Sequence, residues 1–456
     1  MNRVTKRTWL MGLFIGILLG GMLFFLWEYA TEADEWVSFA GSPHVYNNTN
    51  IGCGTITDRS GKTLLDLTES RNYSPNQQTR KSTLHWLGDR NGFISAAAVS
   101  SYAGAMAGFD HFNGVYNSGE GGTARLTLSA DVQNVALEAM GGRKGTIGVY
   151  NYKTGEILCA VSTPTYDPDN VPDIAGDTSG AYDGVYLNRF IQSSYVPGSI
   201  FKIVTVAAAL ECVPGIEEKT FHCYGKVEYG TEAVTCEKAH GQQSFRGAFA
   251  NSCNCAFAEI AELVGKSNML EYVKKFEITK SLSFDGITTA KGNYDISNTA
   301  PVSFAWSCIG QHSDLINPAR FMTFMGAIAG GGSTVEPYLM AHVENGGEAT
   351  YEVRPNKTGR LMSEQTAAQV KAYMRNNVQQ VYGDWNFPGL EVCAKSGTSQ
   401  LGGEQNPNAM FAGFVDNEAY PLAFIIVVEH GGYGSHTCVP ILSKVLSACV
   451  TVMDGE

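Results

Sequence analysis

Hydrophobic and polar positions divide this chain of 456 residues into three stretches. The first is an uncharged apolar run of 19 residues from Trp9 to Trp27. As a helix it would span about 28 Å, close to the roughly 30 Å of a bilayer core. We therefore expect a short stub at residues 1–7 and a membrane-spanning helix at residues 8–28. The alternative is a cleaved signal peptide, but its apolar stretch is usually shorter, and no clean cleavage site follows Trp27.

The second stretch, residues 29–122, is polar, rich in glycine and short of periodic segments. We interpret it as a small pedestal that holds the third stretch, residues 123–456, off the membrane. Periodic strands and helices are clear only in this third stretch. The expected elements are a hairpin at about 145–162, helices from Ser199 and at about 245–265 (interrupted) and 318–328, strands at about 390–396, 410–416 and 422–429, and a helix at about 439–453. This mixture predicts an α+β domain with a mainly antiparallel sheet flanked by helices.

The charge balance limits the partners and sets an orientation. A net charge of −12 argues against nucleic-acid binding, which needs a basic face. Arg3, Lys6 and Arg7 precede the apolar run, whereas acidic residues follow it. The positive-inside rule therefore puts the N-terminus in the cytoplasm and the rest of the chain outside.

The eleven cysteines are an odd number, so at least one is unpaired or joins another chain. Cys223 and Cys236 flank a possible hairpin and are the best disulfide candidates. Cys253 and Cys255 form a C-x-C pair, but no second pair at zinc spacing accompanies it. We therefore expect these two residues to be small packing residues, and we expect no metal site.

Ser199 and Lys202 are the strongest candidates for chemistry. They stand three positions apart in Ser199-Ile200-Phe201-Lys202, at the start of a predicted helix, so they share one helix face. A hydroxyl is a poor nucleophile unless a base removes its proton, and a neutral lysine amine can act as that base. The alternative, a helix cap followed by a solvated lysine, would explain neither the Pro197-Gly198 lead-in nor the ordered motifs downstream.

Two further motifs follow Ser199 in the order that such chemistry needs. Ser252-Cys253-Asn254 has the S-x-N form, and Lys395-Ser396-Gly397-Thr398 has the Lys-[Ser/Thr]-Gly form after a strand-like run. Other copies match in letters only, because they precede the serine or lie in a polar loop. These copies are Ser70-Arg71-Asn72, Ser74-Pro75-Asn76, Lys153-Thr154-Gly155 and Lys357-Thr358-Gly359.

With these motifs the chain resembles the class B penicillin-binding proteins, which are serine acyltransferases, from about Thr123 to the C-terminus. Upstream, residues 54–61 resemble the R-G-x-I-x-D-R-N-G box of the class B pedestal, with Cys53 where arginine is usual. The resemblance implies a transpeptidase domain at residues 123–456 with the β-lactamase-like fold. It also implies peptidoglycan D,D-transpeptidation, crosslinking of stem peptides through an acyl-enzyme, and inhibition by β-lactams.

The residues suggest a role for each motif. Ser199 attacks a carbonyl, which the resemblance implies is the one between two terminal D-alanines, and Lys202 is the base, its pKa lowered by burial and by Lys395. Ser252 relays a proton to the leaving group, and Asn254 orients Lys202 and a substrate amide. Lys395 supplies positive charge. The substrate's carboxylate binds at Ser396, Gly397 and Thr398, and backbone N–H groups of Ser199 and Thr398 hold the oxyanion. No cofactor is required.

The resemblance also implies a partner, a polytopic membrane glycosyltransferase of the SEDS type. Gly12, Gly16 and Gly20 would give the membrane helix a flat strip for close packing, although glycine is common in membrane helices in any case. Three alternatives to a transpeptidase stay open. Water could accept the acyl group, as in a D,D-carboxypeptidase or a β-lactamase, or the chain could be a non-catalytic β-lactam sensor or scaffold.

Overall fold

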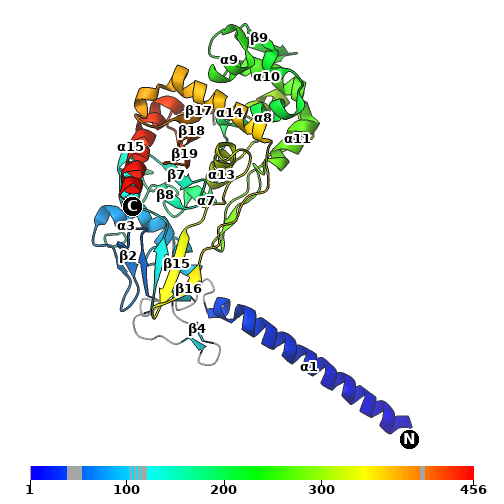
Figure 1. Ribbon diagram of the computed structural model, residues 1–456, viewed down its shortest axis with the longest axis vertical. Coiled ribbons are helices and arrows are strands. Elements are labelled where there is room, and N and C mark those ends of the chain that lie inside the picture. Colours follow the sequence, from blue (N-terminus) through cyan, green and yellow to red (C-terminus); the bar gives the residue numbers. More distant parts are fainter. Residues whose placement is uncertain are drawn as a thin grey trace.

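The computed structural model describes residues 2–37, 54–102, 105–106, 109–110, 114–115, 121–400 and 406–455. Cys53 lies outside the described residues. Helix α1 (Asn2–Val37) extends away from the folded body (Figure 1). Its segment Val4–Ala33 is long enough to cross a membrane, and it contains an 18-residue window with a mean hydropathy of 2.3, none of which is buried. The helix is therefore longer at both ends than the span of residues 8–28 that hydrophobicity alone predicted.

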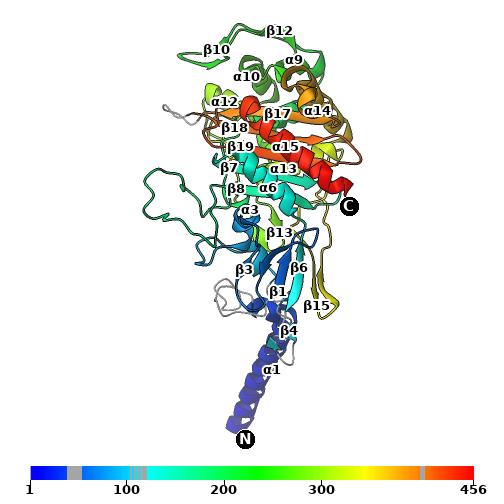
Figure 2. The ribbon, with the colours of Figure 1, turned by 90° about the vertical axis from the view of Figure 1, so that its left-hand side faces the viewer.

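A five-stranded antiparallel sheet forms the centre of the larger part of the body (Figure 2). The strand order is β17-β18-β19-β7-β8, and β17 is therefore an edge strand. The strands are β7 (Gly145–Asn151), β8 (Ile157–Thr163), β17 (Val392–Ser399), β18 (Asn408–Val415) and β19 (Leu422–Val428). The predicted hairpin and the three predicted C-terminal strands are thus confirmed.

Helices cover both faces of this sheet, and this explains why its central strand is apolar throughout. In β19, Phe424 and Ile426 join the core under α6 (Ala130–Met140) and α15 (Gly434–Asp454). Ile425 and Val427 point to the opposite core, which α13 (Pro318–Ala329) covers. α15 is apolar enough to resemble a membrane span, but it packs on the sheet.

A helical region lies beyond the edge strand β17 (Figure 1). The predicted helix at 245–265 is interrupted as expected, into α9 (Phe245–Ala250) and α10 (Asn254–Val264). The other helices of the domain are α7 (Arg189–Gln192), α8 (Lys202–Cys212), α11 (Lys266–Lys275), α12 (Pro301–Ile309) and α14 (Glu364–Asn377). Short strands here are β9 (Thr220–Cys223), β10 (Lys226–Tyr229), β11 (Glu232–Thr235) and β12 (Gly241–Ser244). The hairpin of β13 (Ser283–Phe284) and β14 (Ile287–Thr288) instead lies beside β15, because Asp285 between them accepts a hydrogen bond from the N–H of Met340.

A second sheet, called the lower sheet, lies between the five-stranded sheet and α1 (Figure 1), with the order β16-β15-β6-β1-β2-β3. Its strands are β1 (Gly54–Thr57), β2 (Thr63–Asp66), β3 (Asn72–Tyr73), β6 (Gly122–Leu126), β15 (Met340–Asn345) and β16 (Glu348–Glu352). The sequence did not predict that β15 and β16 would join strands from near the N-terminus. Other described elements of this part are α3 (Gln77–Leu87), α4 (Ala97–Ser100), β4 (Phe109–Asp110) and β5 (Gly114–Val115).

Asp58 lies within the segment that resembles the class B box, and it links the β1–β2 turn to helix α6. Its carboxylate accepts hydrogen bonds from the backbone N–H groups of Ser60 (2.8 Å) and Lys62 (2.9 Å) in the β1–β2 turn. It also accepts one from the N–H of Ala130 (3.0 Å) at the first turn of α6. A carboxylate at a helix N-terminus is electrostatically favourable. The segment therefore connects the lower sheet to α6, the helix that covers one face of the five-stranded sheet.

Candidate active site

Ser199 lies on a short 3₁₀ turn, Gly198–Phe201, that leads directly into α8. Side chains three positions apart eclipse each other in a 3₁₀ helix, so Ser199 and Lys202 project to the same side. Gly198 has φ +55°, and a Cβ there would meet the carbonyl oxygen of Thr398 at 2.6 Å. The glycine thus lets the serine turn pack directly on the edge strand β17.

Lys202 is fully buried, and its amine points at the second motif. Its Nζ donates to the carbonyl oxygen of Ser252 at 2.7 Å, and lies 2.7 Å from Oδ1 of Asn254 and 3.1 Å from Oγ of Ser252. Burial lowers the pKa of Lys202 from its usual 10.5 to about 7. The lowered pKa makes the amine available as a base near neutral pH.

Ser252 occupies the break between α9 and α10 and bridges two amines. Its φ of +50° lies in the left-handed region, which costs a non-glycine residue on the order of 1 kcal/mol. Backbone bonds hold this turn, from Ser252 N to the oxygen of Phe249 and from Cys253 N to that of Ala248. Oγ of Ser252 lies 3.1 Å from Nζ of Lys202 and 3.1 Å from Nζ of Lys395.

Lys395 comes from the third motif on β17 and is also fully buried. Its Nζ donates to the carbonyl oxygen of Ser396 at 2.9 Å, besides its contact with Ser252. Burial, together with the nearby charge of Lys202, lowers the pKa of Lys395 well below its usual value. The two amines meet at one hydroxyl, and the charge of Lys202 disfavours protonation of Lys395.

The hydroxyls of the site are more accessible than its amines, since Ser199, Ser252, Ser396 and Thr398 are only partly buried. Among the described residues, the Ser199 hydroxyl has no hydrogen-bond partner. The amine of Lys202 is thus hydrogen-bonded to the second motif and not to Ser199. Catalytic hydrogen bonds are often long before substrate binds.

Gly397 allows β17 to approach the serine turn. A Cβ at this position would meet the oxygen of Pro197 at 2.9 Å and the N of Ile200 at 3.2 Å, both backbone atoms. Oγ1 of Thr398 accepts a hydrogen bond from the N–H of Gly434 at 3.3 Å, at the start of α15. These contacts align the third motif with Ser199.

Two residues that sequence reasoning did not assign to the site support the third motif. The Tyr382 hydroxyl lies 3.0 Å from Oγ of Ser396 and accepts a hydrogen bond from its backbone N–H at 2.9 Å. Gln311 donates from Nε2 to the carbonyl oxygen of Thr398 at 3.2 Å. Nothing around Tyr382 in the sequence indicates its role.

The discarded motif copies lie elsewhere, as predicted. Lys153 is in the turn between β7 and β8 and pairs with Glu418. Ser70 bonds to Asn72 at β3 in the lower sheet, and Asn76 caps α3. Only the three selected motifs converge.

The prediction of a Cys223–Cys236 disulfide was wrong, because both residues are free thiols. They do flank the β10–β11 hairpin, but each faces a different partner. Cys223 Sγ lies 3.5 Å from Nδ1 of His240, and Cys236 Sγ lies 3.7 Å from Sγ of Cys253. Cys253 is therefore more than the packing residue that the sequence suggested.

Comparison with known proteins agrees with this geometry. The family model described as the penicillin-binding protein transpeptidase domain matches residues 145–447. The peptidoglycan D,D-transpeptidase PbpA of Mycolicibacterium smegmatis is 27% identical over 342 residues, which cover 68% of each chain. Stage V sporulation protein D of Bacillus subtilis is 28% identical over 346 residues, which cover 71% of this chain and only 52% of that relative.

Solved structures share the fold. The D,D-transpeptidase domain of a peptidoglycan glycosyltransferase from Eggerthella lenta has a TM-score of 0.75 at 25% identity, with 88% of this chain and 98% of that chain covered. Penicillin-binding protein A of M. tuberculosis, as a ceftriaxone acyl-enzyme complex, has a TM-score of 0.75 at 22% identity, with 87% and 97% covered. The chain thus belongs to the penicillin-binding protein transpeptidase family, and within it to the class B proteins.

Proposed function

We propose that this protein is a peptidoglycan D,D-transpeptidase that works through an acyl-enzyme on Ser199. The observation that carries the proposal is the meeting of two buried amines, Lys202 and Lys395, at the hydroxyl of Ser252. Such an arrangement moves protons between a nucleophile, a base and a leaving group without a metal or an organic cofactor. The relatives named as peptidoglycan D,D-transpeptidases support the same reaction.

In this proposal the neutral amine of Lys202 takes the proton of Ser199 as its oxygen attacks the carbonyl between two terminal D-alanines. Backbone N–H groups of Ser199 and Thr398 stabilise the oxyanion, and one such donor contributes about 3–4 kcal/mol. Ser252 passes a proton to the leaving D-alanine. The amine of a neighbouring stem peptide then takes the acyl group, which closes the crosslink and frees Ser199.

The third motif and Asn254 position the substrate. The carboxylate of the terminal D-alanine contacts the hydroxyls of Ser396 and Thr398, and Gly397 keeps the strand close to the nucleophile. A carboxylate near Lys395 favours the charged form of that amine. Asn254 holds Lys202 through its Oδ1 and faces the substrate amide. A β-lactam, which resembles the D-Ala-D-Ala end, acylates the same serine.

The remaining regions place the transpeptidase domain relative to the membrane. We propose that residues 1–7 lie in the cytoplasm, that 8–28 span the membrane, and that the pedestal (29–122) lifts the transpeptidase domain (123–456) toward its substrate outside. The membrane partner is a polytopic glycosyltransferase of the SEDS type. Gly12, Gly16 and Gly20 leave open space along α1, with no atom within 4 Å of a Cβ built at each.

Labelling with a fluorescent penicillin tests the proposal, using the full chain in detergent. We expect stable labelling of the wild type and none of Ser199→Ala. The matched control is Ser194→Ala in the same segment, whose hydroxyl bonds only to the oxygen of Lys291. Rapid release of the label would indicate a β-lactamase, and no labelling of folded wild type would indicate a scaffold.

A second assay separates a transpeptidase from a carboxypeptidase. The wild type is incubated with a D-Ala-D-Ala stem peptide and an acceptor amine, and the products are analysed by mass spectrometry. A crosslinked product supports the proposal, whereas a shortened peptide alone indicates hydrolysis.

A further inference from the structure

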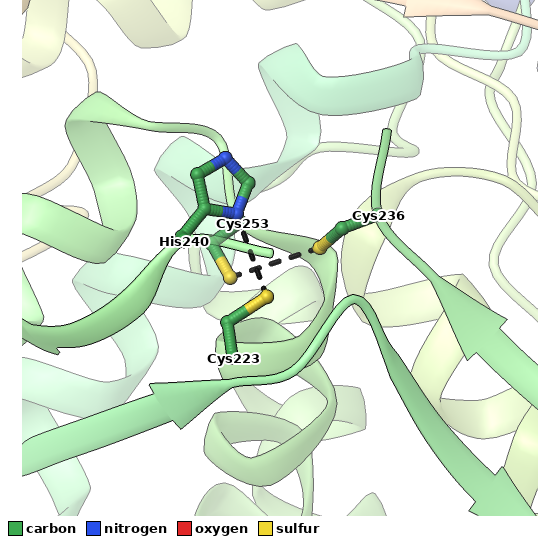
Figure 3. A group of neighbouring side chains, drawn as sticks. All are labelled: Cys223, Cys236, His240 and Cys253. Carbon is green, nitrogen blue, oxygen red and sulfur yellow. Dashed lines mark hydrogen bonds between the residues drawn. The ribbon is translucent and has the colours of Figure 1, made fainter. Parts of the chain in front are cut away.

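Four potential metal ligands lie together beside the second motif (Figure 3). Cys223 ends β9, Cys236 follows β11, His240 precedes β12, and Cys253 caps α10. Their three sulfurs and one imidazole nitrogen all lie within 4.8 Å of one another. The catalytic proposal uses none of these four side chains.

The spacing of the donor atoms fits a tetrahedral metal site. Zn²⁺ binds sulfur at about 2.3 Å and imidazole nitrogen at about 2.0–2.1 Å. Tetrahedral angles then place two sulfurs about 3.8 Å apart, and a sulfur and a nitrogen about 3.6 Å apart. The Cys236–Cys253 sulfur pair is 3.7 Å apart, and Cys223 Sγ lies 3.5 Å from Nδ1 of His240.

Backbone N–H donors point at two of the three sulfurs, and such donors stabilise a thiolate, the form in which cysteine binds metal. The backbone N–H of Cys255 donates to Sγ of Cys236 at 3.3 Å, and that of Ala256 donates to Sγ of Cys253 at 3.4 Å. Both N–H groups belong to the first turn of α10, where the helix dipole also favours negative charge. Cys223 and Cys253 are buried, while Cys236 and His240 are half-buried, so an ion can reach the site from solvent.

We propose that Cys223, Cys236, His240 and Cys253 bind one structural Zn²⁺ ion. Three thiolates and one imidazole in a tetrahedron suit Zn²⁺ among the divalent metals, and binding releases the thiol protons. The protein fills all four positions, so the ion has no open position for water or substrate and takes no part in the chemistry.

A bound ion would fix the position of the second motif. Cys253 stands between Ser252 and Asn254, so a bound ion ties the left-handed turn at Ser252 to β9 and to the end of β11. Asn254 reinforces that link, since its Nδ2 donates to the oxygen of Thr235 at 2.8 Å. The metal is thus expected to hold Ser252 and Asn254 against Lys202.

Metal analysis of the full chain, purified in detergent under reducing conditions without chelator, tests the proposal. We expect one zinc per chain in the wild type, and loss of zinc in Cys236→Ser and His240→Ala. The control is Cys212→Ser, a half-buried thiol of α8 outside the cluster, which should keep its zinc.

Two measurements on the wild type avoid variants that fail to fold. Removal of zinc by a chelator should expose three more reactive thiols, and Co²⁺ added to the stripped protein should give the absorption of a tetrahedral thiolate site. Stripping should also slow penicillin labelling by roughly tenfold or more, and added Zn²⁺ should restore it.

The proposal is overturned if neither the purified protein nor the stripped protein given Zn²⁺ retains zinc, or if Cys212→Ser loses as much zinc as Cys236→Ser. A native disulfide between two of the three cysteines, found by peptide mapping, would overturn it as well. Stable penicillin labelling of a zinc-free protein would leave the proposed function intact, so the two proposals fail separately.

Discussion

Two polar clusters meet at neighbouring residues of one turn, and they are built in opposite ways. On one side, Ser252 contacts the amines of Lys202 and Lys395, which burial drives toward their neutral forms. On the other side, Cys253 contacts the thiol of Cys236, and backbone N–H groups of α10 donate to both sulfurs. The same α9–α10 break therefore serves a proposed proton-transfer site and a proposed metal site.

The comparison teaches that the two clusters need different kinds of environment. A lysine that acts as a base must be neutral, so it needs a dry site without a strong counter-charge. A thiolate site needs N–H donors and a cation. If this division is correct, changes to the amines should alter acylation without altering zinc content.

The largest effect is expected from removing the proposed base. Lys202→Ala should lower the rate of penicillin acylation by roughly 10²–10⁴-fold, because general-base catalysis contributes about that much. Penicillin labelling stopped at successive times measures this rate. The zinc content of the variant should stay at the wild-type value. Lys266→Ala is the control, since Lys266 also bonds to a backbone oxygen and lies over an aromatic ring, Phe304. An equal loss in Lys266→Ala would mean that the effect is structural.

A steric change between the strand and the serine turn should have the next largest effect. In Gly397→Ala the new methyl group meets backbone atoms of Pro197 and Ile200, which must move apart. A displacement of about 1 Å can reduce a rate by roughly 10²-fold. Gly359→Ala is the control, because a Cβ there has nothing within 4 Å and the residue belongs to a discarded motif copy. Unchanged acylation in Gly397→Ala would contradict the close packing.

The pH dependence of the acylation rate tests the protonation state of Lys202. The lowered pKa of Lys202, about 7, means that the amine is protonated and inactive below this pH. The acylation rate should therefore rise about tenfold per pH unit below about 7 and level off above it. A rate that rises only near pH 10, the range of an unperturbed lysine, would contradict the role of burial.

The smallest effect is expected at Tyr382. Tyr382→Phe removes the hydroxyl that contacts Oγ and the backbone N–H of Ser396. Loss of a hydrogen bond of about 0.5–1.5 kcal/mol should lower the second-order acylation rate by roughly two- to tenfold. Tyr373→Phe, whose hydroxyl bonds to Glu217 away from the site, is the control. Equal rates in the two variants would remove Tyr382 from the site.

Much of the catalytic half could be predicted because its signals are local. The run of apolar residues in β19 predicts a strand covered on both faces, and the sequence also predicts the interruption of the helix at 245–265 near the second motif. The Ser199 and Lys202 spacing places both side chains on one side of a turn. The lower sheet was harder to predict, because β15 and β16 are far in sequence from β1 and contribute long-range pairing that no local pattern reveals.

The sequence by itself determined which residues can do chemistry, namely one serine, two lysines and their ordered motifs, since these depend on residue type and short spacing. Only the tertiary structure decided which amine meets which hydroxyl, that Tyr382 supports Ser396, and that Cys223, Cys236, His240 and Cys253 converge. Those four proposed ligands stand 13, 4 and 13 positions apart, so only Cys236 and His240 form a close pair in sequence. Burial and proximity arise from packing between distant segments, and these set both the pKa of a lysine and the geometry of a metal site.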